Sequence, residues 1–313
     1  MRKMRFFDIE NMKEIIGEAF SREIEKAEIN IDEEMKYYKI FYPLTKILPL
    51  FGKRYSHVME NYIYEEDGKI IGLLETRKHN LGLTQWYVST LAVHKDFRGR
   101  GIGTRLLNFV FDTYGERGVK KFFLDVRNDN PALKLYERVG FEKYQTNFAM
   151  RTKEISQREI EIRGLRKMDM FKDWEKLWEL YLKVTPDKVL KILEAKKEDA
   201  KSKRFDSVIQ RIGEEIGKHE IHKFVVEKNG RIVAKLQVAC SKRDSPHQIS
   251  ITSNADSNLC KNLILKAFSI IAKYPKRLIL SNCHDYEPEV KKALIDSGFE
   301  IFETFYGMYK ILG

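Results

Sequence analysis

The sequence predicts an α/β protein built as two tandem domains of one fold. Its 313 residues are enough for two domains of ordinary size, each burying its own core. Segments typical of strands alternate with segments typical of helices. Three blocks also recur in the same order at nearly constant offset: residues 4–15 resemble 162–173, 62–72 resemble 224–234, and 140–150 resemble 298–308. The polar stretch 151–158 separates the copies, so we expect one domain at 1–153 and another at 160–313.

The first domain opens with a predicted strand at residues 4–7 and a helix at 12–20. Residues 62–66 and 69–76 flank Asp67-Gly68, a strong turn signal that predicts a β-hairpin from these two segments. A longer strand is expected at 85–93.

A helix is expected to start near Gly101, because Ile102, Leu106, Val110 and Tyr114 recur every four residues and form one apolar stripe. The next predicted elements are a strand at 122–126, a helix at 131–139 opened by Asn130 with proline at its first position, and a last strand at 141–150.

The loop between the long strand and this helix has the composition of an anion site. Gly99, Gly101 and Gly103 alternate with Arg98, Arg100 and Ile102. Glycines let successive backbone N–H groups turn toward one point, and a helix start adds unpaired N–H groups and the positive end of its dipole. A pyrophosphate fits such a loop. The alternative is a tight strand–helix turn carrying surface arginines.

Composition excludes several classes of protein. Hydrophobic residues make up 43% of the chain, yet we find no apolar run of about 18 residues and no signal peptide. Three cysteines without CxxC spacing, Cys240, Cys260 and Cys283, argue against a disulfide framework and a zinc site and favour small buried side chains. We expect a cytoplasmic protein without metal or membrane contact. The net charge is +11, but basic residues are interspersed with acidic ones, so a nucleic-acid partner is not expected.

Two motifs make the first domain resemble the GNAT superfamily of N-acyltransferases. Arg98, Gly101 and Gly103 fill the pattern Gln/Arg-x-x-Gly-x-Gly/Ala, and a second pattern is filled by Asn130, Ala132, Tyr136, Gly140 and Phe141. The resemblance implies tandem domains, each a mixed, mostly antiparallel sheet flanked by helices. It further implies acetyl-CoA as co-substrate, no metal, and transfer of an acetyl group to a primary amine by direct attack.

The resemblance also implies roles for individual residues. Tyr136 matches the tyrosine that protonates the departing sulfur, although a tyrosine on an apolar helix face is otherwise a core residue. Backbone N–H groups near the end of the long strand would polarise the carbonyl. The expected donor-binding residues are Leu91, Ala92, Val93, Arg98, Gly99, Arg100, Gly101, Ile102, Gly103, Thr104, Asn130 and Tyr136.

Two acidic residues are candidates for the general base. Asp125 aligns roughly with a glutamate used by N-terminal acetyltransferases of ribosomal proteins, but the spacing to Tyr136 is one residue shorter and Asp reaches less far. Glu75 lies on the preceding hairpin strand. Either carboxylate could act through a water, and either could instead be an ordinary surface or ion-paired group.

The acceptor site is expected to draw on residues 36–57, which are rich in aromatic side chains. Tyr37, Tyr38, Phe41, Tyr42, Phe51 and Tyr55 could line a cleft, although Tyr37, Phe41 and Leu44 also have the spacing of a packed helix face. The acceptor would be an amine-bearing small molecule or a protein or peptide amine, and the protein a monomer or homodimer.

The second domain has lost the loop chemistry. At the offset of 158, Arg98 maps to Asp256, Gly101 to Leu259, Gly103 to Lys261 and Tyr136 to Leu294. This predicts a degenerate domain without a donor site. Two other functions remain open: a non-catalytic acyl-CoA sensor or interaction module, and a tandem-domain aminoacyl transferase that uses charged tRNA.

Overall fold

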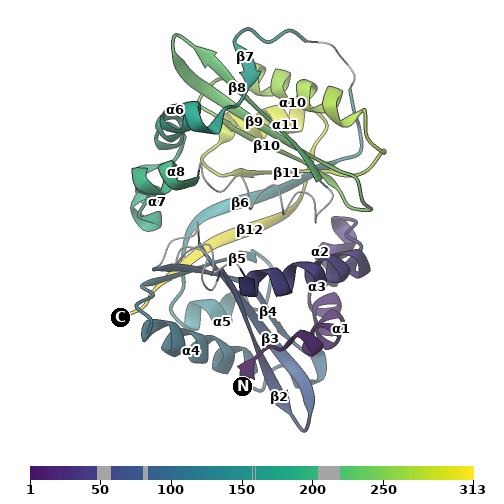
Figure 1. Ribbon diagram of the computed structural model, residues 1–313, viewed down its shortest axis with the longest axis vertical. Helices are drawn as coiled ribbons and strands as arrows, with labels where there is room; N and C mark the ends of the chain where they lie inside the picture. The colour runs from purple at the N-terminus through teal and green to yellow at the C-terminus, as the bar shows by residue number, and fades with distance from the viewer. Residues whose placement is uncertain (48–57, 80–83, 157, 159, 204–218) are drawn as a thin grey trace. The chain divides into compact units, whose positions relative to one another are not determined.

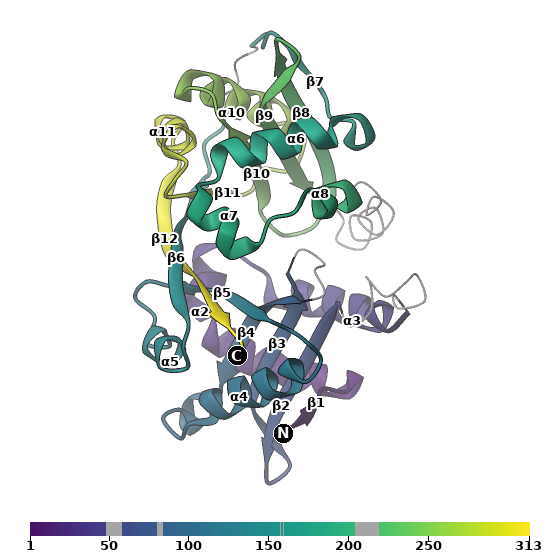
Figure 2. The same ribbon diagram turned by 90° about the vertical axis from the view of Figure 1, so that its left-hand side faces the viewer.

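The chain forms two compact units in the computed structural model, which describes residues 1–47, 58–79, 84–156, 158, 160–203 and 219–313. The first unit comprises Met1–Tyr144 together with Tyr306–Gly313, and the second comprises Gln145–Phe305. Each unit contains its own run of sheet strands with helices on both faces, which confirms the predicted α/β architecture in tandem (Figures 1 and 2).

The sheet of the first unit has the order β1-β2-β3-β4-β5-β12. Its neighbours pair antiparallel from β1 to β4, whereas β4 and β5 are parallel. Helices α1 to α3 cover one face, and α4 and α5 cover the other (Figure 1). The elements are β1 (Arg2–Lys3), a 3-10 turn η1 (Phe6–Asp8), α1 (Ile9–Ala19), α2 (Ser21–Lys26), α3 (Ile31–Ile47), β2 (Met59–Glu66), β3 (Lys69–Lys78), β4 (Gln85–Val93), η4 (Lys95–Phe97), α4 (Ile102–Gly115), β5 (Lys121–Arg127) and α5 (Leu133–Arg138).

Most predicted elements of this unit are confirmed. The 85–93 strand matches β4, the hairpin turns at Asp67-Gly68 with positive φ at both residues, and the stripe from Ile102 to Tyr114 is buried. The predicted strand at 4–7 is wrong. The strand is shorter and earlier, because the Asp8 carboxylate accepts from the Arg5 N–H at 2.6 Å and bends the chain into η1.

The second unit repeats this plan with the order β6-β11-β10-β9-β8-β7. Its one parallel pair among the described strands is β10 with β11. Helix α6 packs on one face, and α10 and α11 on the other (Figure 2). Its elements are β6 (Glu142–Thr152), β7 (Leu165–Lys167), α6 (Met170–Val184), α7 (Asp187–Leu193), α8 (Lys197–Lys203), β8 (His219–Lys228), β9 (Arg231–Ser241), β10 (His247–Ser253), α10 (Ser257–Ile271), β11 (Ile279–His284), α11 (Pro288–Asp296) and β12 (Glu300–Ile311).

The two sequence halves exchange their last strands. Met150, at the end of the first half, is fully buried in the core of the second unit, where it contacts Cys283. Its repeat counterpart Met308 is buried in the core of the first unit, and the Leu312 N–H donates to the Lys120 carbonyl there. The compact units therefore differ from the sequence repeats 1–153 and 160–313 by this exchange, and the division into functional domains at those residues stays a prediction.

An ion-pair network shows how closely the two copies match. Arg2 donates from both terminal guanidinium nitrogens to Asp8 (2.7 and 2.9 Å) and from Nε to Glu65 (2.9 Å). In the second unit Arg166 binds Asp173 (2.8 and 2.7 Å) and Glu227 (3.0 Å) in the same way. Arg2 of β1 lies opposite Ile63 of β2, and Arg166 of β7 lies opposite Val225 of β8, which is the equivalent position. The structure therefore aligns Arg2 with Arg166, an offset six residues larger than the 158 used for the first pair of sequence blocks.

The three cysteines are buried free thiols, as predicted, and burial raises the pKa of Cys240 and Cys283 to about 12. Within the described ranges, no helix is both long and apolar enough to cross a bilayer.

Candidate active site

The sheet of the first unit opens between its two parallel strands. The pairing of β4 with β5 joins Gln85–Tyr87 to residues 121–123, and the described ladder ends there. The rest of β4, up to Val93, pairs only with β3 on its other side. The described ladder between β4 and β5 therefore stops short of their carboxyl ends, and this unpaired stretch, called the gap below, is where open α/β sheets bind ligands.

A bulge in β4 lies at the beginning of this gap. Glu75 on β3 is opposite Thr90 and the next residue, Thr76, is opposite Val88, so Ser89 is an extra residue on β4. A bulge reverses which face the following side chains occupy. Accordingly Trp86 and Val88 lie in the core beneath α4 before the bulge, and Leu91 and Val93 pack against the same core after it.

The backbone of β4 presents donors to the gap. The His94 N–H donates to the Ile71 carbonyl of β3 at 2.9 Å. Because N–H groups alternate sides along a strand, the Ala92 N–H also faces β3, whereas those of Leu91 and Val93 face β5. Two donors thus point into the opened part of the sheet, the arrangement that stabilises an oxyanion. Of the three residues predicted here, Leu91 and Val93 direct their N–H groups toward β5, whereas Ala92 directs its N–H toward β3.

The loop after β4 leaves a further set of donors open. Gly99 and Gly101 have φ of +78° and +76°, a conformation that side chains resist, and a Cβ on either would meet open space. Gly101 is the N-cap of α4 and has no side-chain cap. Among the described residues, no backbone or side-chain acceptor binds the N–H groups from Gly99 to Thr104. This helix start therefore suits an anion.

The predicted arginines are partly engaged by the protein. Arg98 donates through Nε to the Val93 carbonyl (2.9 Å) and pairs with Glu18 of α1 (3.2 Å). Arg100 lies over the Phe97 ring and donates to the Asp96 carbonyl (3.3 Å). Both side chains keep exposed surface, so they add positive charge beside the loop.

Helix α5 is held next to the start of α4. A Cβ on Gly103 would lie 3.5 Å from Leu135 of α5 and 3.7 Å from Leu91 of β4, so these three segments meet at this glycine. The prediction that Asn130 opens this helix with proline at its first position is wrong, because α5 starts at Leu133 with Ala132 as its N-cap. Asn130 holds the turn before α5: its side-chain oxygen accepts from the Ala132 N–H and its carbonyl accepts from the Leu133 N–H. The predicted Asn130 thus positions the helix that carries Tyr136.

Tyr136 is buried against Phe141, yet its hydroxyl has no hydrogen-bond partner within the described part of the chain. Burial raises its pKa, so the group stays protonated and able to donate.

Both candidate bases lie on the face of the sheet that α1 to α3 cover. Glu75 accepts from Ser89 (2.7 Å) and from Tyr38 of α3 (3.0 Å), and the Tyr38 hydroxyl in turn accepts from Asn61 (2.8 Å). Burial raises the pKa of Glu75, while the Ser89 and Tyr38 hydrogen bonds oppose that rise. Sequence reasoning did not identify Ser89 or Asn61 as members of this network. Neither the bulge that places Ser89 nor the hydrogen bond that Asn61 relays through Tyr38 has a sequence signature.

Asp125 on β5 is exposed and accepts from the Tyr87 hydroxyl at 2.7 Å. Burial, and then the neighbouring Asp125 charge, raises the pKa of Tyr87. The two acids therefore lie in different surroundings: Glu75 belongs to a largely buried hydrogen-bond network, and Asp125 faces solvent beside Tyr87.

The predicted acceptor stretch is described in part. Tyr38 reaches Glu75, whereas Tyr42 is buried and donates to the Met4 carbonyl at 2.9 Å, as a core residue would. Phe51 and Tyr55 lie outside the described residues.

The fold and this site together are those of the N-acyltransferase class of proteins. A mixed sheet opens between its parallel strands and leads to a glycine-rich helix start. The sequence model of the Acetyltransferase (GNAT) family matches residues 12–141. The chain belongs to this family.

Similar proteins agree with this assignment. The N-alpha-acetyltransferase 30 of Schizosaccharomyces pombe is 30% identical over 119 residues, which are 33% of this chain and 79% of that protein. Other curated relatives are matched over a smaller part of their length, 23% in one case and 38% in two.

Two solved structures share the fold over most of the chain. A GCN5-related N-acetyltransferase from Sphaerobacter thermophilus matches with a TM-score of 0.66 at 13% identity, and the match covers 99% of this chain and 95% of that chain. A tandem GNAT protein from the clavulanic acid biosynthesis pathway has a TM-score of 0.56 at 14% identity, covering 82% of this chain and 83% of its own.

Proposed function

We propose that the first unit transfers an acetyl group from acetyl-CoA to a primary amine. The observation that carries the proposal is the continuity of donors: N–H groups of Leu91 and Val93 face the gap beside β4, and the free N–H groups of residues 99–104 follow at its end. The first set suits a developing oxyanion and the second a pyrophosphate, and a thioester of CoA carries both groups.

The chain's residues fit this co-substrate. A Cβ at Gly99 or Gly101 would project into open space that a phosphate would need, and both backbones adopt φ values that favour glycine. Arg98 and Arg100 add positive charge at the loop's rim. The predicted donor residues Leu91, Val93, Gly99, Gly101 and Gly103 thereby receive distinct physical roles, and Asn130 supports α5.

In the proposed reaction the amine nitrogen attacks the thioester carbonyl, and the N–H groups of Leu91 and Val93 stabilise the oxyanion. The intermediate collapses by breaking the C–S bond. The Tyr136 hydroxyl gives its proton to the sulfur, and the amine's proton passes to a carboxylate, so the products are an amide and free CoA.

We favour Glu75 as the base. A base works best when its pKa approaches the working pH, and burial moves the pKa of Glu75 in that direction. Its hydrogen bonds to Ser89 and Tyr38 hold the carboxylate in place. Asp125 remains the second candidate, and its exposure would let it act through a water.

The experiment is a mass-spectrometric screen of the purified full chain with acetyl-CoA against small-molecule amines and peptides with free N-termini or lysines. Acetylation of at least one amine class, lost in Gly101→Asp, supports the proposal. Binding of acetyl-CoA without turnover on any amine would favour the non-catalytic sensor. Transfer from charged tRNA in its place would favour an aminoacyl transferase.

A further inference from the structure

The face of the first unit's sheet that carries Glu75 also carries a row of charged and aromatic side chains. Arg77 follows Glu75 by two residues on β3, so both side chains lie on the same face. Arg77 is opposite Tyr87 of β4, and Tyr87 is opposite Phe123 of β5. Asp125, two residues after Phe123, accepts from the Tyr87 hydroxyl at 2.7 Å. This row, from Arg77 to Asp125, borders the beginning of the gap.

Arg77 offers this row a guanidinium that the protein leaves available. The guanidinium carbon lies 4.8 Å from the centre of the Tyr87 ring, and the residue is exposed. Within the described part of the chain, Arg77 makes no hydrogen bond and no ion pair. Its planar set of N–H donors can therefore bind a carboxylate through two parallel hydrogen bonds.

The second unit carries the same row with different side chains. Strand pairing continues the offset of 162 between the two sequence copies from β2 and β8 into β3 and β9. Gln237 is therefore the counterpart of Glu75, and Ala239 is the counterpart of Arg77.

The third charged position of the row also has a neutral counterpart. In each unit the row continues across the next strand to the parallel strand, which it reaches at Phe123 in the first unit and at Leu280 in the second. Asp125 and Asn282 each follow two residues later. Two carboxylates and a guanidinium in the first unit thus correspond to two carboxamides and a methyl group in the second.

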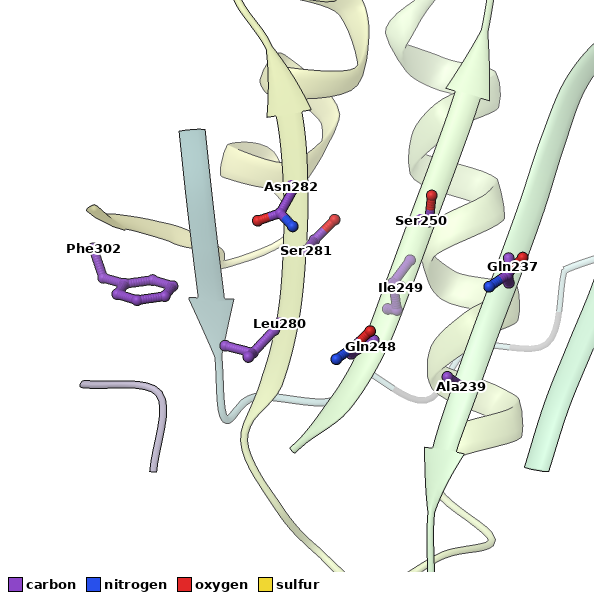
Figure 3. Close-up of a pocket in the computed structure, with 9 residues that line it drawn as sticks. All are labelled: Gln237, Ala239, Gln248, Ile249, Ser250, Leu280, Ser281, Asn282 and Phe302. Carbon is purple, nitrogen blue, oxygen red and sulfur yellow. The ribbon is translucent and has the colours of Figure 1, made fainter. Parts of the chain in front are cut away.

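In the second unit this row lines a hollow of about 170 Å³, with Gln237, Ala239, Leu280 and Asn282 around it (Figure 3). The hollow lies where the described pairing of β10 with β11 ends, at residues 249 and 281. The fold therefore forms a recess of small-molecule size beside this row. In the first unit the same row adjoins the proposed acetyl-transfer site and is charged.

The direction of the proposed attack brings the acceptor to the charged row. Tyr136 packs in the core beneath α4, whereas Glu75 lies on the opposite face of the sheet and bonds Tyr38 of α3. If the sulfur leaves on the Tyr136 side, the amine arrives from the Glu75 side, and the rest of the acceptor lies beside Arg77. The net charge of +11 also favours an acceptor that carries negative charge.

We propose that the acceptor is an amino acid whose carboxylate binds Arg77 while its amine lies at Glu75. This inference rests on the proposed acetyl transfer and names its substrate class. The amine nitrogen forms the new amide bond, the C–S bond breaks, and the amine's proton passes to Glu75. The carboxylate is unchanged, so the products are an N-acetyl amino acid and free CoA.

The first test compares the common L-amino acids, each beside its own C-terminal amide, as acceptors for the full chain and acetyl-CoA. We expect kcat/KM to be at least about tenfold higher for the preferred amino acid than for its amide, because only the acid can form the charge-assisted pair. Equal rates for acids and amides would overturn the proposal, and so would faster acetylation of diamines than of any amino acid.

The second test uses Arg77→Gln and Arg77→Lys, with Lys143→Gln as the matched control. Lys143 is an exposed cation 3.6 Å from the centre of the Tyr306 ring, which packs against the core on the other face of the sheet. Arg77→Gln should raise KM for the amino acid by about 10- to 100-fold, leave kcat and acetyl-CoA affinity nearly unchanged, and remove the preference for acid over amide. Arg77→Lys should keep part of this preference and Lys143→Gln all of it. A preference that survives in Arg77→Gln would overturn the proposal.

Binding of the product separates this inference from the proposed function. N-acetyl amino acids can occupy the carboxylate site without turnover, so saturation-transfer NMR of the full chain should show saturable binding that Arg77→Gln weakens about tenfold or more. If no amine is acetylated but this binding is seen, the acetyl-transfer proposal fails and the carboxylate site stands. If amines are acetylated but N-acetyl amino acids bind the parent and Arg77→Gln equally, the carboxylate site alone is overturned.

Discussion

The starts of α4 and α10 are the same structural position built in two opposite ways. In the first unit the N-cap is Gly101, which leaves the first N–H groups of the helix without a partner. In the second unit the N-cap is Asp256, whose carboxylate accepts from the Leu259 N–H at 2.9 Å, while Glu289 accepts from the Ser257 N–H at 2.9 Å. Carboxylates of the protein itself thus occupy the place that an external anion would take.

The comparison teaches that the residues around the helix start decide whether this fold offers an anion site or a self-capped helix: a glycine loop leaves the N–H groups open, and carboxylates of the protein close them. The sequence aligned Asp256 with Arg98, but the structure places it at the position of Gly101 because the loop before α10 is shorter. The position of Tyr136 matches the prediction better. Its carbonyl accepts from the Phe141 N–H at 2.9 Å, as the Leu294 carbonyl accepts from Phe299 at 3.0 Å.

The largest expected effect comes from making the first unit resemble the second. In Gly101→Asp the new carboxylate should cap α4 and repel the phosphates, lowering acetyl-CoA affinity by about 10³-fold or more, since charge-assisted hydrogen bonds contribute about 1.5–3 kcal/mol each. Calorimetry measures this. Gly68→Asp is the control, because its φ of +74° and open surroundings match those of Gly101. Both variants should lose about 1–2 kcal/mol of stability from the left-handed backbone, but only Gly101→Asp should lose binding; equal binding in both would contradict the comparison.

The second effect concerns the position where the units carry tyrosine and leucine. Tyr136→Phe should lower kcat by about 10²–10⁴-fold with little change in acetyl-CoA affinity, because the ring and its packing remain. Tyr114→Phe is the control: its hydroxyl binds Glu60 at 2.6 Å inside the core, so this change should reduce stability and leave kcat nearly intact. Steady-state kinetics with calorimetry separates the two. An unchanged kcat in Tyr136→Phe would assign Tyr136 to the core, like Leu294.

The third effect tests the buried acid through pH. Glu75 acts as a base only when ionised, and burial raises its pKa, so kcat/KM should rise with pH through an apparent pKa above 4.5. Glu75→Gln should remove this acidic limb and lower kcat/KM at neutral pH by about 10²-fold or more. If Asp125→Asn removes the limb and Glu75→Gln does not, Asp125 is the base.

Glu75→Gln should raise the stability of the protein at neutral pH, although it lowers kcat/KM there. A carboxyl with a raised folded-state pKa contributes stability below its unfolded pKa, and that contribution is lost as pH rises through the folded value. Glu75→Gln should therefore gain thermal stability relative to the parent at pH 7 and not at pH 4, which distinguishes loss of the base from loss of the fold.

The smallest effect is expected in the second unit. Asp256→Ala removes an N-cap and should cost about 1 kcal/mol of unfolding free energy, measured by urea denaturation. Acetyl-CoA stoichiometry should stay at one per chain by calorimetry, because Glu289 still occupies the helix start and no glycine loop precedes it. A second acetyl-CoA site in this variant would mean that Asp256 alone closes the position.

The elements whose limits depend on local chemistry could be predicted from sequence. The hairpin at Asp67-Gly68, the long strand β4 and the start of α4 follow from turn residues and from apolar periodicity. The bulge at Ser89 could not, since it becomes visible only in the register between β3 and β4. The shared network of Glu75, Tyr38 and Asn61 likewise depends on which face of the sheet α3 covers.

The exchange of last strands between the two halves could not be predicted from the sequence either. Residues 140–150 and 298–308 are copies of one pattern, so either segment satisfies the alternation that each sheet requires. A period of two identifies a strand but not the sheet that receives it. Only the structure shows that Met150 enters the core of the second unit and Met308 that of the first.

This exchange of last strands determines when the first unit can complete its fold during synthesis. The first unit ends its continuous part at Tyr144 and receives its closing segment only at Tyr306, so the ribosome must make the intervening residues first. At about 5–20 residues per second this delay lasts roughly 10–30 s. Throughout it, the edge of β5 and the pocket for Met308 are exposed in the nascent chain. We therefore expect the first unit to complete folding late and slowly, after the continuous second unit has been made, because its last contacts join residues as distant as Lys120 and Leu312.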